Sequence, residues 1–96
     1  MRLANRRDVN QRQIMSALEK AGCTVADTSR VGNGYPDISV GRTYRAGGSH
    51  TYLLEIKSSR TASLPPDQIC FRDSWKGHYA VVWDVESALI AVGIIK

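Results

Sequence analysis

Residues 51–57, TYLLEIK, contain the stretch that decides the fold. In an extended strand, successive side chains point to opposite faces of a sheet. One face therefore collects the apolar side chains Tyr52, Leu54 and Ile56. This alternation predicts a strand that packs on a hydrophobic core. The opposite face carries Glu55 and Lys57, two ionisable side chains separated by roughly 7 Å along the strand.

A second strand is expected directly before this one. Residues 37–42 alternate between polar and apolar side chains, which is typical of a half-buried strand. The intervening residues 46–49, AGGS, have the composition of a hairpin turn. We therefore expect the two strands to pair as a hairpin. That pairing would make Asp37, at the start of one strand, a neighbour of Glu55 on the other.

The remaining elements follow from hydrophobic periodicity and from helix and turn signals. Apolar residues recur at helical spacing over residues 9–21, and Gly22 follows as a C-terminal cap. We expect a short strand at 23–29 and a turn at 32–36 before the two hairpin strands. After the hairpin we expect a helix that is opened by Pro65 and Pro66 and ends near Gly77, and then a strand at 78–83. A short final helix would be capped by Asp84 and ended by Gly93. Residues 92–95 are equally consistent with a strand. The order α-β-β-β-α-β with a small ending predicts an α/β (α+β) sandwich and a single domain over residues 1–96.

Length and charge set bounds on function. The chain has 96 residues and a formal net charge of +4. Its basic excess gathers in residues 1–12 and 42–60, each with four basic side chains against one acidic. Such stretches fit nucleic acid as a partner and fit a solvated basic surface about equally well. A domain of this length buries only a thin core, so a second subunit would add stability.

Targeting signals and disulfides are not expected. The sequence has no long apolar run, so neither a secretory signal nor a membrane span is predicted. Cys23 and Cys70 have neither the spacing of a metal motif nor the density of a disulfide scaffold. We therefore expect a cytoplasmic protein with reduced thiols, in which both cysteines are buried filler.

The expected hairpin places two acids at one end of the sheet. Paired carboxylates such as Asp37 and Glu55 suit Mg²⁺ or Mn²⁺, which prefer oxygen ligands. The backbone carbonyl of Ile56 could add another oxygen, and Lys57 projects from the same face as Glu55, within reach of a metal-bound water. This set fits phosphodiester hydrolysis. The competing interpretation is a solvated Glu–Lys ion pair, with an aspartate that closes its own turn.

Three motifs and their order resemble the PD-(D/E)XK nuclease superfamily, and most closely the small stand-alone VRR-NUC domains of phages and bacteria. They are residues 34–37 (GYPD), 53–57 (LLEIK) and 64–68 (LPPDQ), which follow an opening helix. The resemblance implies a restriction-endonuclease-like core, with a central mixed sheet flanked by helices. It also implies a metal-dependent DNA endonuclease that acts as a homodimer on branched DNA such as Holliday junctions. The location would be the cytoplasm of a bacterium or of a phage-infected bacterium.

The same resemblance implies roles for individual residues. Asp37 and Glu55 would bind Mg²⁺ or Mn²⁺, Lys57 would orient or activate the attacking water, and Gln68 would support the site. Gln11 stands where the family often has a metal-binding glutamate on the first helix. Its amide oxygen is a weaker ligand than a carboxylate, so Gln11 would bind the metal weakly or act through water. Gln11 also favours the alternative function, a non-catalytic or weakly catalytic DNA-binding module that keeps the fold.

Further side chains have simpler interpretations. The expected DNA-binding residues are Arg6, Arg7, Arg12, Ser58 and Arg60. Asp27 is the reserve metal ligand, and His50 and His78 are expected to be surface residues. The aromatic residues Trp75, Tyr79 and Trp83 are expected in the core or at a dimer interface. A sequence-specific restriction enzyme is the least favoured interpretation, because 96 residues leave little room for a recognition lobe.

Overall fold

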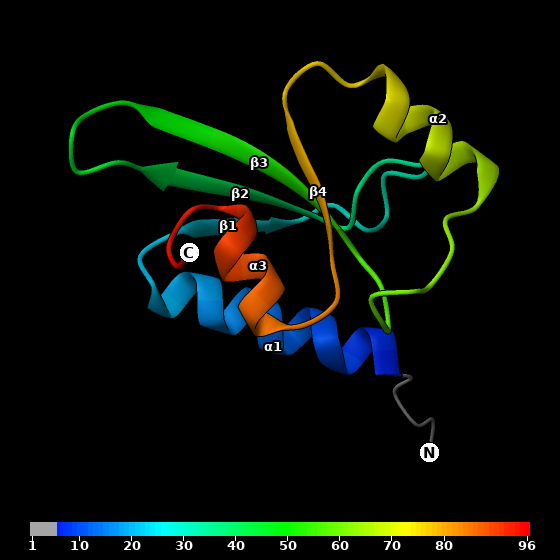
Figure 1. Cartoon of the computed structure of the whole chain (residues 1–96), viewed down its shortest axis with the longest axis horizontal. Helices are drawn as coiled ribbons and strands as arrows, with labels where there is room; N and C mark the ends of the chain where they lie inside the picture. Colours follow the sequence, from blue (N-terminus) through cyan, green and yellow to red (C-terminus); the bar gives the residue numbers. More distant parts are fainter. Residues whose placement is uncertain (1–5) are drawn as a thin grey trace.

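Four strands form one mixed sheet in the computed structural model, which describes residues 6–96 except the side chains of Arg6 and Arg7. The strands are β1 (Thr24–Asp27), β2 (Ile38–Thr43), β3 (Ser49–Ile56) and β4 (His78–Val82). Their spatial order is β1-β2-β3-β4 (Figure 1). The first three strands pair antiparallel, and β4 runs parallel to β3. This arrangement confirms the predicted mixed sheet and element order.

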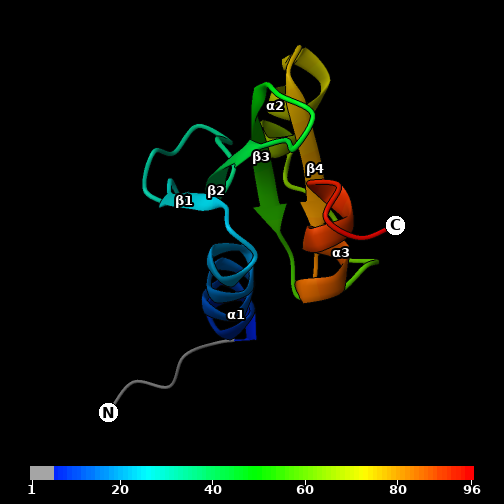
Figure 2. The same ribbon diagram turned by 90° about the vertical axis from the view of Figure 1, so that its left-hand side faces the viewer.

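Three helices lie on the two sides of this sheet. α1 (Arg6–Lys20) and α3 (Val85–Ala91) lie on one side, and α2 (Pro66–Ser74) lies on the other (Figure 1, Figure 2). Proline at the first position of a helix is favourable because its missing N–H would have no partner there. None of the nine residues of α2, all within the described part of the chain, is buried. No helix among residues 6–96 is both long and apolar enough to cross a bilayer.

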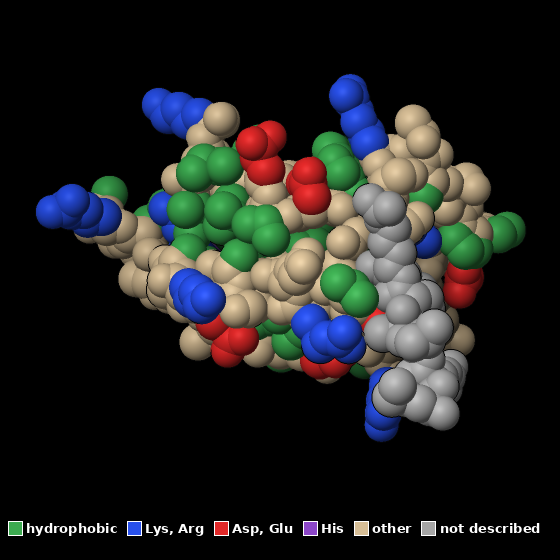
Figure 3. Space-filling view, turned by 90° about the horizontal axis from the view of Figure 1, so that it is seen from below, with side chains coloured by type: hydrophobic (Ala, Val, Ile, Leu, Met, Phe, Trp, Pro, Cys, Tyr) green, Lys and Arg blue, Asp and Glu red, His purple; other side chains and the backbone are tan. Residues whose placement is uncertain are grey.

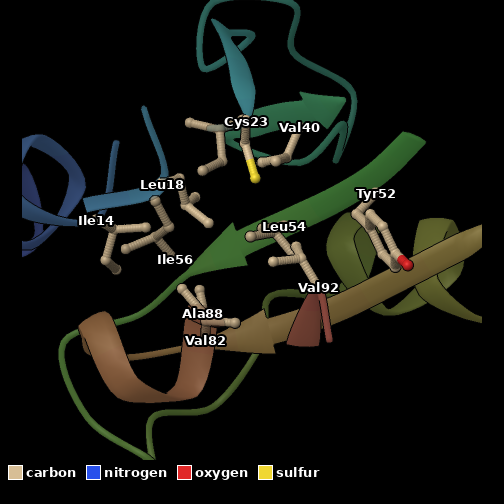
Figure 4. Close-up of a cluster of buried hydrophobic side chains, with 11 residues drawn as sticks. Ile14, Leu18, Cys23, Val40, Tyr52, Leu54, Ile56, Val82, Ala88 and Val92 are labelled. Carbon is tan, nitrogen blue, oxygen red and sulfur yellow. The ribbon is translucent and has the colours of Figure 1, made fainter. Parts of the chain in front are cut away.

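The hydrophobic core lies between the sheet and the α1–α3 pair (Figure 4). Leu54 and Ile56 of β3 are fully buried there, as the alternation in residues 51–57 predicted. Ile14 and Leu18, one helical turn apart on α1, pack against them. The core cluster also includes Cys23, Ile38, Val40, Tyr52, Val82, Ala88 and Val92. Hydrophobic periodicity in the sequence thus predicted both the buried face of β3 and the buried face of α1.

The hairpin between β2 and β3 sets the register on which the candidate site depends. Gly47 and Gly48 have φ values of 105° and 86°, a region that glycine enters without steric cost. This turn connects β2 to β3 and fixes their pairing, in which Ile38 lies opposite Leu54. Asp37, one residue before Ile38, therefore reaches the level of Glu55, one residue after Leu54. The predicted convergence of the two acids follows from this register.

Several details differ from the sequence-based expectations. Residues 92–95 do not form a strand, because α3 ends at Ala91 with Val92 as its C-cap, and Gly93 (φ 77°) turns the chain. The second helix ends at Ser74, three residues before the glycine expected to end it. Cys70 is exposed, so its expected role as buried filler is wrong; Cys23 alone fits that expectation. Trp75 has 43% of its surface exposed and lies outside the core of the chain.

A capping box begins α3 and provides a first testable prediction. The Asp84 carboxylate accepts a hydrogen bond from the Ser87 N–H (2.7 Å), and the Ser87 hydroxyl accepts one from the Asp84 N–H (3.1 Å). Asp84→Ala should lower the free energy of unfolding by about 1 kcal/mol, because it removes one of these caps. Asp84→Asn, which can still cap, should cost less. Urea unfolding followed by circular dichroism would measure both; equal losses would contradict the capping role.

Candidate active site

Asp37 and Glu55 come together at the end of β3. The Asp37 carboxylate accepts a hydrogen bond from the backbone N–H of Ile56 through Oδ2, at 2.8 Å. This bond holds the aspartate against the strand that carries Glu55. The two side chains are nearly inaccessible, with 4% and 1% of their surface exposed. Buried carboxylates are rare, and the free energy cost of removing them from water must be offset by hydrogen bonds, an ion pair or a bound metal.

Lys57 and Gln68 complete the cluster. The Lys57 ammonium lies 3.8 Å from Glu55 Oε2 and donates a hydrogen bond to Gln68 Oε1 at 2.6 Å. Lys57 is itself buried, and its backbone N–H bonds the carbonyl oxygen of Val82 on β4 at 2.9 Å. The structure therefore brings together all four residues expected to be catalytic: Asp37 and Glu55 from the hairpin, Lys57 after β3, and Gln68 in the first turn of α2.

Loop contacts hold the Pro36–Asp37 segment in place. Thr28, just after β1, donates from its backbone N–H to the carbonyl of Asp37 and from its hydroxyl to the carbonyl of Pro36, both at 2.8 Å. A tight turn precedes this segment, with Gly34 at φ 79°. The aspartate is thus positioned by its own backbone as well as by its side chain, as preorganised sites require.

Asn10 supports the site from α1, a role that the sequence analysis missed. Its side-chain amide donates to the carbonyl oxygens of Trp83 (3.1 Å) and Lys57 (3.4 Å), which joins the ends of β3 and β4. The available signal was its spacing: Asn10 precedes Ile14 by four residues, so it shares the buried stripe of the helix. A polar residue on such a stripe needs hydrogen-bond partners.

Close backbone contact between the turn at Gly34 and the first turn of α2 positions Gln68. A Cβ atom added to Gly34 would lie 2.3 Å from the carbonyl oxygen of Asp67 in α2. Only glycine permits this approach, which brings the turn before Asp37 against the first turn of α2. The rings of Tyr35 and Phe71 meet edge to face beside it, with centroids 5.2 Å apart. These contacts explain how a helix without buried residues still places Gln68 beside Lys57.

Substitution of Gly34 tests this contact. Gly32 provides the matched control, because its φ of 82° resembles the 79° of Gly34 but its Cβ position has no described atom within 4 Å. Gly32→Ala should cost about 1 kcal/mol of stability, from backbone strain alone. Gly34→Ala should cost roughly 2–4 kcal/mol, because it adds a clash with backbone that must move. Chemical unfolding would measure both costs, and equal values would show that the loop contact is not required.

The electrostatic field of the two acids extends to β4. Tyr79 lies opposite Leu53, on the same face as Glu55. Burial raises the pKa of Tyr79 to about 12, with a further contribution from the negative charge of Glu55 and a smaller one from Asp37, against the opposing effect of Arg72. The phenol therefore remains protonated at neutral pH. The parallel pairing of β3 and β4 places Tyr79 beside the acids, and no sequence pattern predicted this neighbourhood.

Gln11 lines a cavity that is separate from the Asp37–Glu55 cluster. It is 9% exposed and lines a cavity of about 270 Å³ between α1 and the end of β1. The other described residues that line this cavity are Asp8, Arg12, Met15, Asp27, Ser29 and Arg30, a set that does not contain Asp37 or Glu55. Hydrogen bonds from Ser29, and a weaker one from Gln11, lower the pKa of Asp27. The roles of Gln11 and of the reserve ligand Asp27 at a metal stay predictions.

The expected DNA-binding residues lie on the surface where the structure describes them. Arg12 is exposed at the rim of the Gln11 cavity, and Ser58 and Arg60 are exposed in the loop after Lys57. The side chains of Arg6 and Arg7 lie outside the described residues. Figure 3 shows the side of the molecule that carries α1 and α3, where an apolar patch lies among scattered basic and acidic side chains.

Comparison with known proteins supports the fold. No protein-family model matches the chain, and no curated protein matches it. A solved structure of a VRR_NUC domain is similar to it, with a TM-score of 0.72 and 22% sequence identity over 91% of this chain and 96% of the other. The chain therefore has the fold of a VRR_NUC domain. This confirms the fold that the sequence motifs predicted.

Proposed function

We propose that the protein is a divalent-metal-dependent DNA endonuclease that hydrolyses phosphodiester bonds. The observation that carries this proposal is the burial of Asp37, Glu55 and Lys57 together at the end of β3, within a nuclease-type fold. There Asp37 is hydrogen-bonded to the Ile56 N–H and Lys57 forms an ion pair with Glu55. Desolvating three ionisable groups is unfavourable for folding, and replacing such groups by apolar residues often stabilises a protein. A catalytic role accounts for keeping them at this position.

The donor atoms at this position suit Mg²⁺ or Mn²⁺. Carboxylate oxygens are the preferred protein ligands of both ions, and the carbonyl of Ile56 is a further candidate. Among residues 6–96, no three His, Cys, Asp or Glu side chains converge as a complete metal cage. Mg²⁺ commonly binds through one or two carboxylates and keeps waters and substrate phosphate oxygens as its other ligands. A site with Asp37 and Glu55 as its only carboxylates fits that pattern.

The side chains would divide the chemistry between them. When bound, the cation would polarise the phosphoryl group and lower the pKa of water. Lys57, held by Gln68 at 2.6 Å, would direct its remaining N–H groups toward the attacking water and the developing negative charge. Asp37 is fixed by the Ile56 N–H, so it would hold its ligand position without reorganisation. Gln68 acts through Lys57 and is a positioning residue.

The proposed substrate is branched DNA such as a Holliday junction, and the proposed active species is a homodimer. The exposed residues Arg12, Ser58 and Arg60 provide contacts for DNA phosphates. Exposed apolar side chains supply surface that a second subunit can cover, as large apolar patches often do. The most exposed of them near the helices are Trp75, Ile90 and Ile95.

A cleavage assay tests the proposal. The full chain is incubated with labelled four-way junction, duplex and single-stranded DNA, in Mg²⁺, in Mn²⁺ and in a chelator. Metal-dependent cleavage that prefers the junction, and that is lost in Asp37→Asn, is the expected result. Static light scattering on the same sample should give the mass of a dimer. Cleavage without metal, or unchanged cleavage by Asp37→Asn, would overturn the proposed mechanism.

The second candidate is a DNA-binding module without cleavage activity. Gln11 favours this candidate for two reasons. Its amide is a weaker metal ligand than the glutamate that could stand at this position. Its side chain lines a cavity whose described lining residues do not include Asp37 or Glu55. This candidate predicts that the wild type and Asp37→Asn bind junction DNA equally and that neither cuts it. Gel-shift titration beside the cleavage assay separates the two functions.

A further inference from the structure

The only two histidines of the chain meet on the surface of the sheet. His50 belongs to β3 and His78 is the first residue of β4. Their side chains are exposed, and His50 Nδ1 lies 3.1 Å from His78 Nε2. Their positions in the sequence predict only two separate surface residues. The parallel pairing of β3 with β4, which aligns Tyr52 with His78, brings them together.

We propose that His50 and His78 form a binding site for a borderline divalent transition metal ion such as Zn²⁺, separate from the Asp37–Glu55 cluster. Two nitrogen ligands about 2.1 Å from one ion are about 3.0 Å apart at a right angle and about 3.4 Å apart at the tetrahedral angle. The separation of 3.1 Å between the two ring nitrogens falls within that interval. Small rotations of these exposed rings would aim both lone pairs at one ion.

Aromatic neighbours hold the two imidazoles in position. The His78 ring stacks on Tyr52, with centroids 4.5 Å apart and planes 24° apart. The His50 ring meets Tyr44 edge to face at 4.8 Å, and the hydroxyl groups of Tyr44 and Tyr52 contact each other. Restricted side chains lose less conformational entropy when they bind a ligand. Both imidazoles are therefore restrained before a metal arrives and need only small rotations to bind it.

The chemistry of the pair distinguishes it from the candidate active site. Imidazole nitrogen suits Zn²⁺, Cu²⁺ and Ni²⁺, whereas the carboxylates at the other site suit Mg²⁺ and Mn²⁺. His50 precedes Glu55 by five residues on β3, which corresponds to about 16 Å along the strand. Arg42 is the cross-strand partner of His50 and stacks on the ring of Tyr44, with the guanidinium carbon 4.0 Å from the ring centroid. Its positive charge opposes the binding of a cation.

Metal binding would join β4 to β3 at the end opposite the candidate active site. β4 lies at one edge of the described sheet and pairs with one strand. A shared ion would therefore stabilise its attachment in the folded state only, and the protein would melt at higher temperature as the ion concentration rises. Both ring nitrogens must present a lone pair, so the proton between them moves to the other nitrogen of its ring or to solvent on binding.

Titration with ZnCl₂ tests the site. The tag-free full chain, in a Cys70→Ser background because that exposed thiol could also bind zinc, is titrated by calorimetry in excess Mg²⁺. We expect one Zn²⁺ per chain. The affinity for Zn²⁺ should fall by at least about tenfold in His50→Asn and by a similar factor in His78→Asn. The melting temperature should rise with Zn²⁺ in the parent protein and stay constant in both variants.

Nuclear magnetic resonance of the unmutated histidine rings gives a second readout that does not depend on the folding of a variant. Zn²⁺ should shift the ring nitrogen signals of His50 and His78 together. No saturable binding, binding that persists in either variant, one ion per two chains, or a shift of one ring alone would each overturn the proposal. Because these measurements use no DNA, their result is independent of whether the protein cleaves DNA.

Discussion

Replacing Lys57 with methionine is expected to reduce the rate of DNA cleavage by about 10²–10⁴-fold. Lys57 is the cation that contacts Glu55, at 3.8 Å, and its ammonium is oriented by Gln68. Methionine fills a similar volume but has no N–H group to orient water or stabilise negative charge on the phosphate. Single-turnover cleavage of saturating junction DNA would measure the loss in the chemical step.

Two further variants show whether this loss belongs to the site. Gln68→Ala should reduce the rate by about tenfold, because it removes only the partner that orients Lys57. Lys76→Met removes an exposed lysine after α2 and should leave the single-turnover rate at saturation unchanged. Circular dichroism and DNA binding should remain near wild type in all three. A folded Lys57→Met variant that cuts at the wild-type rate would contradict the catalytic role of Lys57.

Leu54→Ala is expected to cause the largest loss of stability, about 2–5 kcal/mol. Leu54 is fully buried at the centre of β3, packed between the sheet and the α1–α3 pair (Figure 4). Truncation would remove buried methyl groups and leave a cavity that the neighbouring strands cannot close. A small domain has only about 5–15 kcal/mol of total stability, so this variant could be largely unfolded near body temperature. Urea unfolding at low temperature would measure the loss.

An exposed apolar residue provides the matched control for the core. Val31, in the loop after β1, has 57% of its surface exposed, so Val31→Ala should change the stability by about 0.5 kcal/mol or less. A similar loss in the two variants would mean that Val31 is buried in solution by a second subunit or that Leu54 is less tightly packed than the structure indicates. Repeating the measurement at several protein concentrations separates these outcomes, because dimer stability depends on concentration.

Most of the candidate site was predictable because its residues lie in, or directly beside, strands and helices that local sequence patterns predict. The alternation in residues 51–57 and the glycine-rich turn before it determine the hairpin register, and the register places Asp37 beside Glu55. Lys57 follows from the same alternation. Gln68 was predicted through the family resemblance, since periodicity alone places it only near the start of a helix. The metal and the reaction stay proposals, because carboxylate spacing does not identify a bound ion.

Other features depend on contacts between distant segments, which no local pattern encodes. The approach of Gly34 to the backbone of Asp67 joins the turn before β2 to the first turn of α2, and strands β2 and β3 lie between these two segments in the sequence. Asn10 reaches the ends of β3 and β4 across the core. The expected burial of Cys70 was wrong because α2 docks through its first turn and a few rings, which leaves its remaining surface open. Helical periodicity predicts a face, but not whether another element covers it.

The sequence by itself determined the order of the elements, the hairpin register and the face of β3 on which the ionisable residues lie. These properties depend on the two-residue period of a strand and on glycine in a turn, which are local. Only the tertiary structure decided which remote groups meet: Gln68 with Lys57, Tyr79 with the field of Glu55, and His50 with His78. Each of these meetings depends on the packing of β4 beside β3 or of α2 against a loop. Such packing is set by the close fit of whole surfaces, and no single stretch of sequence contains it.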